Sequence, residues 1–157
     1  MENSNHFNVI VIGAGISGIG AGYYLKKNCP NKSFCIIEGR ENIGGTWDLF
    51  KYPGIRSDSD MFTLGYAFKP WKEQKTIANG PSILSYLEET VEENNLREKI
   101  KFNHKVLSAN WNSAERNWEV RAAHHEQEIL LTANFLFMGT GYYLSLIHIS
   151  EPTRRHS

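Results

Sequence analysis

The stretch VIVIGAGISGIGAGYYLKKNCPNKSFCIIE, residues 9–38, decides the fold of this chain. Its apolar, β-branched start predicts a strand at residues 8–12, and its end predicts a second strand at residues 33–38. Between them lies a helical run to about Cys29, opened at the spacing G-x-G-x-x-G by Gly13, Gly15 and Gly18. A glycine turn that follows a strand and opens a helix is typical of a βαβ unit that binds a dinucleotide.

Each part of this unit has a physical role in such a site. Gly13 permits the tight turn, Gly15 lets the backbone approach a pyrophosphate, and Gly18 lets the helix pack closely on the strand. The helix N-terminus presents unpaired N–H groups and a positive dipole end to the phosphates. Glu38, twenty residues after Gly18, can accept hydrogen bonds from an adenosine ribose. Its charge opposes a 2′-phosphate, so FAD or NAD is favoured over NADP here, although Arg40 would favour the opposite.

Composition narrows the class of protein. The 157 residues are 41% apolar and 22% charged, as in an ordinary globular domain, and the formal net charge of zero indicates neither nucleic acid nor an anionic membrane as a partner. No apolar run approaches 18 residues and the start carries no signal-peptide core, so we expect a cytoplasmic protein without a membrane segment. Cys29 and Cys35 fit no metal or redox spacing and are expected to be free thiols, and no metal site is predicted.

The last residues do not fit the rest of the chain. The run LSLIHISEPTR, residues 144–154, resembles the translation of a sequencing-library adapter. We therefore expect a native domain at residues 1–143, as the N-terminal part of a larger enzyme, and a non-native, disordered read-through tail at residues 144–157.

The remaining pattern predicts an α/β fold. An amphipathic helix begins at Gly80, and strands at residues 100–111, 118–122 and 128–132 form a three-stranded antiparallel meander, the first of them also expected in the central parallel sheet. The apolar run at residues 134–138 is expected to be a separate, buried parallel strand that ends in Gly139 and places backbone against a ligand. We therefore expect a central parallel sheet with helices on one face and the meander on the other.

Two loop segments after Glu38 carry further candidate residues. Gly44 and Gly45 permit backbone close to a ligand, and the following Trp47 offers an aromatic surface. Farther along lies the segment Tyr52-Pro53-Gly54-Ile55-Arg56-Ser57-Asp58. Capping of the next helix is an alternative role for the aspartates of this region.

Together these motifs resemble the FAD domain of class B flavin monooxygenases, the Baeyer–Villiger and flavin-containing enzymes. The run from Gly44 to Trp71 resembles most closely the ethionamide-activating branch, and the resemblance extends over residues 8–143. It implies a truncated, Rossmann-like FAD-binding domain. It also implies cofactor contacts by a set of residues: Gly13, Gly15, Ser17, Gly18, Glu38, Gly45, Thr46, Trp47, Arg56, Ser57, Asp58 and Val106.

Within this set the resemblance assigns particular roles. Ser17 would lie near the pyrophosphate, and Val106 would offer backbone to the adenine. Arg56, Ser57 and Asp58 would border an NADP site. Asp58 would be a catalytic residue that holds an arginine in place by charge-assisted hydrogen bonds.

The chemistry implied is that of a monooxygenase. FAD is reduced by NADPH and reacts with O2 through a C4a-peroxyflavin, and one oxygen atom reaches a ketone, sulfur or nitrogen. The second glycine motif and the catalytic arginine of the family are absent from this sequence, so the chain alone is expected to be inactive. Two alternatives stay open: another two-dinucleotide flavoprotein oxidoreductase, and a non-catalytic nucleotide-binding module.

Overall fold

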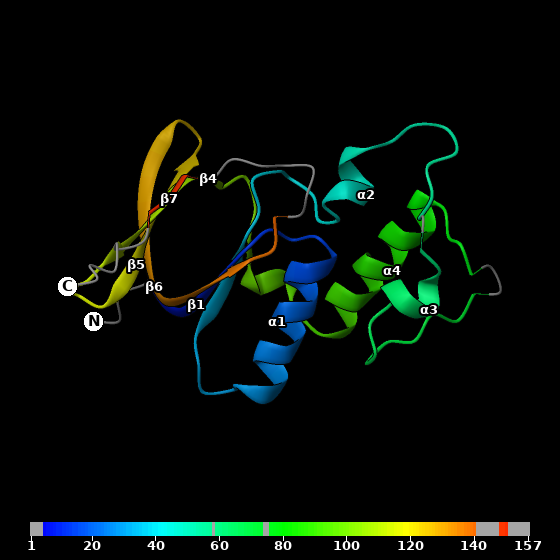
Figure 1. Cartoon of the computed structure of the whole chain (residues 1–157), viewed down its shortest axis with the longest axis horizontal. Helices are drawn as coiled ribbons and strands as arrows, with labels where there is room; N and C mark the ends of the chain where they lie inside the picture. Colours follow the sequence, from blue (N-terminus) through cyan, green and yellow to red (C-terminus); the bar gives the residue numbers. More distant parts are fainter. Residues whose placement is uncertain (1–4, 58, 74–75, 141–147, 151–157) are drawn as a thin grey trace, which may run out of the picture.

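A mixed sheet with helices on one side forms the body of the molecule (Figure 1). The computed structural model describes residues 5–57, 59–73, 76–140 and 148–150. Within them the elements, in chain order, are β1 His6–Ile12, α1 Ile16–Asn28, β2 Phe34–Ile37, α2 Thr46–Leu49, α3 Met61–Leu64, α4 Gly80–Glu93, the 3₁₀ helix η1 Arg97–Lys99, β3 Ile100–Lys101, β4 Lys105–Asn112, β5 Asn117–His124, β6 Gln127–Met138 and β7 His148–Ser150. The expected α/β, Rossmann-like class is confirmed.

The strand that leads into the glycine turn, β1, lies between two other strands of the sheet. The order is β3-β2-β1-β6-β5-β4-β7, and β1 is parallel to both β2 and β6. Val9 pairs with Phe34 on one side and with Phe135 on the other. The carboxyl ends of β1, β2 and β6 therefore meet at one edge of the sheet, where crevices in α/β proteins bind ligands.

The meander and the parallel sheet share a strand, contrary to the expectation of two separate ones. β6 is a single strand of 12 residues, whose first half is antiparallel to β5 and whose second half is parallel to β1. Thr132 pairs with Glu119 on β5 and with His6 on β1. No glycine or proline interrupts residues 127–138, so nothing in the backbone ends the strand between its two halves.

Two hydrophobic cores lie on the two faces of the sheet. Val11 faces α1 and α4 in the first core, with Ile19, Ile83 and Leu87. The second core lies on the opposite face and joins the strands to the meander: its main members are Ile10, Ile12, Cys35, Ile37, Val106, Ala109, Val120 and Leu131. Alternation along β1 sends neighbouring side chains to opposite cores. The predicted arrangement, helices on one face and meander on the other, is therefore confirmed.

The second half of β6 departs from its predicted burial. Phe135 is 69% exposed, and Phe137 and Met138 are also exposed, whereas the intervening Leu136 packs against the second core. The run was expected to be buried on both faces. On the helix side, α1 packs on β1 and β2 and contacts β6 less, and α4 packs against α1 (Figure 1).

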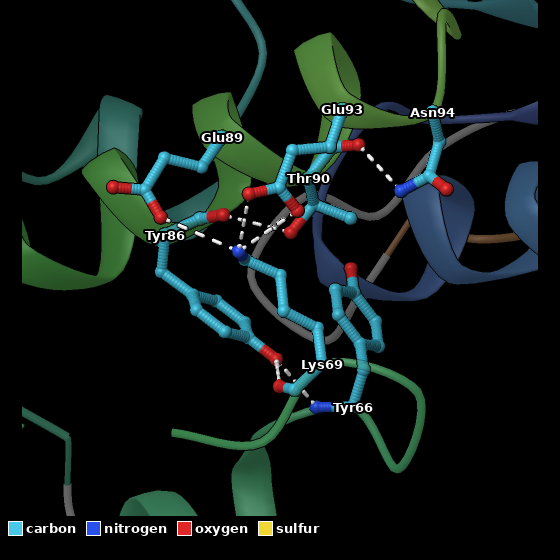
Figure 2. A network of polar contacts seen from close by, with 7 residues as sticks. All are labelled: Tyr66, Lys69, Tyr86, Glu89, Thr90, Glu93 and Asn94. Carbon is cyan, nitrogen blue, oxygen red and sulfur yellow. Dashed lines mark hydrogen bonds and ion pairs between the residues drawn. The ribbon is translucent and has the colours of Figure 1, made fainter. Parts of the chain in front are cut away.

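A polar network fastens the loop before α4 onto that helix (Figure 2). The Tyr86 hydroxyl donates to the Lys69 carbonyl at 2.5 Å and accepts from the Tyr66 backbone N–H at 2.8 Å. Lys69 Nζ lies 3.3 Å from Glu89 and 3.0 Å from Glu93. The Tyr66 hydroxyl in turn donates to the Ile16 carbonyl, and burial raises the pKa of this phenol, so it stays protonated as a donor. This hydrogen bond connects the first turn of α1 to the loop before α4.

Within the predicted tail, three residues form a short strand. His148–Ser150 forms β7, which pairs in parallel with β4 through Ala109 and Ile149. The edge of β4 offers unpaired backbone groups, and a short segment of strand-forming residues can add to such an edge. The boundary at residue 143 and the non-native origin of the tail stay predictions. None of the described helices is long and apolar enough to span a membrane.

Candidate dinucleotide-binding site

A cavity of about 520 Å³ lies where β1, β2 and β6 end. This volume is within the range of small-molecule and cofactor pockets. Its lining comes from five parts of the chain: Ile12, Gly13, Gly15, Ile16, Ser17, Ile37, Glu38, Gly39, Arg40, Gly44, Gly45, Thr46, Trp47, Leu49, His104, Lys105, Val106, Gly139 and Thr140. Eight of the predicted cofactor-binding residues are among them: Gly13, Gly15, Ser17, Glu38, Gly45, Thr46, Trp47 and Val106.

The glycine turn is built from two tight backbone contacts. Gly13 has φ +102°, and a Cβ there would lie 2.5 Å from the Gly139 carbonyl oxygen. A Cβ on Gly18 would lie 1.7 Å from the Gly13 carbonyl oxygen, which no side chain tolerates. Gly18 does not line the cavity. Its role in the described fold is the close packing of α1 on the turn.

Gly15 differs from Gly13 and Gly18 because there is space for a side chain beside it. A Cβ on Gly15 would be 3.6 Å from the Gly45 Cα, an ordinary contact. Gly15 is also the N-cap of α1 and makes no side-chain capping bond. Since the first N–H groups of a helix have no intrahelical acceptor, those of Ile16 and Ser17 can donate to a ligand at the cavity wall.

Glu38 is a buried carboxylate held at the cavity by backbone donors. Its side chain is only 8% exposed. Oε1 accepts from the Ala14 N–H at 3.0 Å, and Oε2 accepts from the Arg40 N–H at 3.1 Å. The Glu38 backbone is fixed as well, because its carbonyl accepts from the His104 N–H at 2.9 Å. A carboxylate has about four lone-pair positions, so capacity remains for ribose hydroxyls.

The opposite wall is formed by the loop that leads into α2. The Gly44 N–H donates to the Ala14 carbonyl at 2.9 Å, which joins this loop to the glycine turn. Thr46, Trp47 and Leu49 of α2 then face the cavity. Between them on the chain, Asp48 is 3% exposed and forms ion pairs with Arg40 at 2.9 Å and with Lys51 at 3.3 Å.

The far end of the cavity is bordered by the start of β4. Val106 is buried there, and His104 stacks on the ring of His124 with centroids 4.0 Å apart. Burial is the main cause that lowers the pKa of His104, opposed by its hydrogen bond with the Phe102 carbonyl and supported by the charge of Lys101. At neutral pH this end of the cavity therefore carries a neutral imidazole.

Besides Gly18, two described residues of the predicted set, Arg56 and Ser57, do not line the cavity. Arg56 pairs with Asn79 in an isolated β-bridge. The Ser57 hydroxyl is engaged in a local turn, where it donates to the Ser59 carbonyl at 2.7 Å. Asp58, the predicted catalytic residue, lies outside the described residues. Asp60 caps α3 by accepting from the Thr63 N–H at 3.0 Å, as the capping alternative predicts.

Some lining residues were not predicted as cofactor contacts. Arg40, His104 and Lys105 belong to no recognisable motif. Their positions follow from the pairing of β2 with β3, which no spacing along the chain reveals. Among the described residues, no group of three or more histidine, cysteine or acidic side chains could hold a metal ion.

The residues present fit the ADP half of a dinucleotide. Helix N–H donors suit a diphosphate, and a buried carboxylate suits a ribose. The fold and the site together define a Rossmann-like dinucleotide-binding domain. A family model described as an NAD(P)-binding Rossmann-like domain matches residues 11–73.

Comparison with curated proteins gives a more particular relationship. The FAD-containing monooxygenase EthA of Mycolicibacterium smegmatis is 53% identical over 140 residues, which cover 89% of this chain and 28% of that protein. The probable FAD-binding monooxygenase AlmA of Acinetobacter baylyi is 51% identical over 140 residues, covering 88% of this chain and 28% of that protein. These matches confirm the resemblance to flavin monooxygenases. The chain is homologous to a portion of these enzymes and spans about 28% of their length.

Solved structures agree. An oxidized steroid monooxygenase bound to NADP matches 88% of this chain and 26% of its own, with a TM-score of 0.79 and 29% identity. The monooxygenase OTEMO in complex with FAD and NADP matches 86% of this chain and 26% of its own, with a TM-score of 0.76 and 31% identity.

Proposed function

We propose that this chain is the FAD-binding part of a flavin-dependent monooxygenase that uses NADPH and O2. The observation that carries the proposal is the Glu38 carboxylate, fixed at the cavity wall by the Ala14 N–H at 3.0 Å. Because Ala14 belongs to the glycine turn, this hydrogen bond sets the ribose-binding group directly beside the phosphate-binding backbone. A single ADP moiety can therefore contact both. The FAD in the names of the relatives supports the choice of dinucleotide.

In this proposal the protein binds and orients the cofactor. N–H groups of Ile16 and Ser17 donate to the diphosphate, and Glu38 accepts from the ribose hydroxyls. The Val106 backbone contacts the adenine, and Gly45, Thr46 and Trp47 form the wall on the side of α2. FAD, when bound, supplies the redox chemistry of the reaction with O2.

The NADP site and the substrate belong to the proposal as well. Arg56, Ser57 and Asp58 would border NADP, and Asp58 would orient an arginine supplied by residues beyond this sequence. A complex of OTEMO with both FAD and NADP supports a second nucleotide site in the whole enzyme. The proposed substrate is a ketone or an organosulfur compound. A cytoplasmic location is part of the same proposal, in keeping with the free thiols of Cys29 and Cys35.

The same thiols speak against a disulfide-reductase type of flavoprotein. Such enzymes need a reactive cysteine pair, and reactivity requires a thiolate. Burial raises the pKa of Cys35 to about 12, so this thiol stays protonated at neutral pH. A monooxygenase needs no redox-active cysteine.

Titration of the chain with FAD tests the cofactor. The measurement is flavin fluorescence with equilibrium dialysis, and riboflavin, which lacks the ADP moiety, is the control ligand. We expect saturable binding of one FAD per chain and much weaker binding of riboflavin. Equal affinities for the two ligands would contradict the proposed site.

The activity is tested on a longer protein that contains this domain. We expect a yellow protein that consumes O2 in the presence of NADPH and oxygenates a ketone or a sulfide. Substrate-dependent NADPH oxidation with no oxygenated product would point to another flavoprotein class.

A further inference from the structure

Among the described residues that line the cavity, Arg40 is the one arginine, and three contacts fix its position. Its backbone N–H donates to Glu38 Oε2 at 3.1 Å, and its carbonyl accepts from the Asn103 N–H at 3.0 Å. Its guanidinium Nη1 lies 2.9 Å from Asp48 Oδ2. Arg40 therefore extends from the end of β2, where Glu38 is held, across to α2.

Asp48 is built to hold this guanidinium. Its side chain is 3% exposed, and its neighbours on α2, Trp47 and Leu49, face the cavity. A buried carboxylate without a cationic partner is costly, so Asp48 and Arg40 stabilise each other where they stand. Lys51, with its side chain 64% exposed, is the second partner of Asp48 and does not line the cavity.

The start of α2 lies directly beside the phosphate-binding turn. A Cβ on Gly45 would be 3.2 Å from the Gly15 Cα, and the Asp48 N–H donates to the Gly45 carbonyl at 3.1 Å. The Arg40–Asp48 pair is thus attached to the same backbone that borders the place for a diphosphate. In the described part of the chain, Asp48 is the only acidic residue that forms an ion pair with the Arg40 guanidinium. Nη1 is buried beside Asp48 and makes no hydrogen bond, but the side chain is 34% exposed, so the remaining N–H donors of the guanidinium are available for phosphate oxygens.

The charges of the lining residues also favour a cationic side chain near the diphosphate. Glu38 brings a negative charge to a site that would receive a doubly charged diphosphate, and the helix dipole offsets only part of it. Arg40 and Lys105 are the cationic side chains of the lining other than histidine. Lys105 lies on β4, at the end bordered by Val106, whereas the Arg40 guanidinium lies beside Asp48 of α2.

We propose that Arg40 contacts the diphosphate of the bound dinucleotide and that Asp48 is the positioning residue that holds its guanidinium there. The inference rests on the proposed dinucleotide site and adds a specific electrostatic contact to it. Arg40 then acts together with Glu38: one side chain binds phosphate, and the other binds the adjoining ribose. A 2′-phosphate is the other phosphate that an arginine near this ribose could contact, and the experiment separates the two sources.

The test uses calorimetric titration with adenosine, ADP and 2′-AMP. Arg40→Gln should weaken ADP binding about 10- to 100-fold, the range for a lost hydrogen bond to a charged group, and change adenosine binding less than about 2-fold. Asp48→Asn should weaken ADP binding in the same direction but less. Lys51→Gln is the matched control, since it removes the other partner of Asp48, and should leave all three ligands unchanged. Arg40→Lys should restore part of the ADP affinity and its dependence on NaCl.

Each other outcome has a definite meaning. An equal loss of ADP and adenosine binding in Arg40→Gln would show a structural role alone and overturn the inference. Loss of 2′-AMP binding with ADP binding intact would assign Arg40 to a 2′-phosphate instead. If the unaltered chain binds ADP tightly and Arg40→Gln and Arg40→Lys bind it equally well, the inference fails while the proposed function stands. If the unaltered chain binds neither ADP nor FAD, both fail.

Discussion

Gly15 and Gly18 belong to the same turn but have different surroundings. A Cβ on Gly18 would lie 1.7 Å from a backbone carbonyl oxygen, whereas on Gly15 it would only reach ordinary contact at 3.6 Å. Gly15 also has φ −88° and ψ −164°, which any residue adopts. We therefore expect Gly18 to be required for folding and Gly15 to be required for ligand binding.

Gly18→Ala should destabilise the fold. The added methyl group overlaps backbone that cannot move without opening the turn, so we expect a loss of about 1–3 kcal/mol or more in the free energy of unfolding. Urea denaturation followed by circular dichroism measures it. Stability equal to that of the unaltered chain would show that the turn is looser than described.

Gly15→Ala should leave the fold intact and impair binding. The methyl group points into the space between Gly15 and Gly45, where backbone must approach a diphosphate. We expect unchanged or slightly higher stability, because alanine restricts the unfolded chain, together with at least about a 10-fold loss of ADP affinity. Full affinity in this variant would mean that the diphosphate does not lie at Gly15.

The position of a residue at the cavity could be predicted from sequence where it follows from spacing, and its role there stays a prediction. Gly13, Gly15 and Glu38 belong to one strand-turn-helix unit whose geometry is regular, so their places at the cavity could be predicted. Arg40 could not, because its partner Asp48 lies across an irregular loop and no periodicity indicates which side chains meet there. Arg56 and Ser57 were assigned by resemblance, and their cofactor contacts stay predictions.

At the scale of elements, β6 does the most to hold the molecule together. It joins the parallel sheet to the meander, and its alternating side chains face different surroundings. Leu131 is 1% exposed within the second core, whereas the preceding Leu130 is 38% exposed. These two adjacent leucines allow a buried and an exposed position of the same strand to be compared.

Leu131→Ala should lower the free energy of unfolding by about 2–5 kcal/mol, because it leaves a cavity between β1 and the meander. Leu130→Ala removes the same atoms from an exposed position and should cost less than about 1 kcal/mol. Thermal and urea unfolding of the two variants measure the difference. Equal losses would contradict the register of β6.

The helices and strands themselves were largely predictable, since glycine turns and apolar periodicity are local signals. The continuity of β6 was not, because a strand that pairs on both edges has no signature distinct from two strands in succession. The exposure of Phe135 and Phe137 was missed for a related reason: an apolar run predicts burial without revealing whether a helix covers it.

At the scale of the whole molecule, the two cores make stability depend on pH. Cys35 lies in the second core, and burial raises the pKa of its thiol from 9.0 to about 12. Above pH 9 the unfolded chain releases this proton while the folded chain retains it. The unfolded state is therefore favoured increasingly as pH rises.

We expect the free energy of unfolding to fall between pH 9 and pH 10 by an amount approaching about 1.4 kcal/mol per pH unit. Above pH 10 the half-buried phenol of Tyr66, whose pKa is also raised by desolvation, adds to the loss. Cys35→Ala removes the ionisable group and should flatten the profile between pH 9 and pH 10. An unchanged slope in that variant would assign the effect to other groups.

The central claim is that the crevice at the carboxyl ends of β1, β2 and β6 receives the ADP moiety of FAD. The most direct measurement is a set of ¹H–¹⁵N correlation spectra of the chain, recorded during titration with FAD. We predict large shift changes for the backbone N–H groups of Gly15, Ser17, Gly45 and Val106, and none for Ala114, in the distant turn between β4 and β5. Saturable changes confined to residues outside the cavity, or no saturable change at all, would contradict the account.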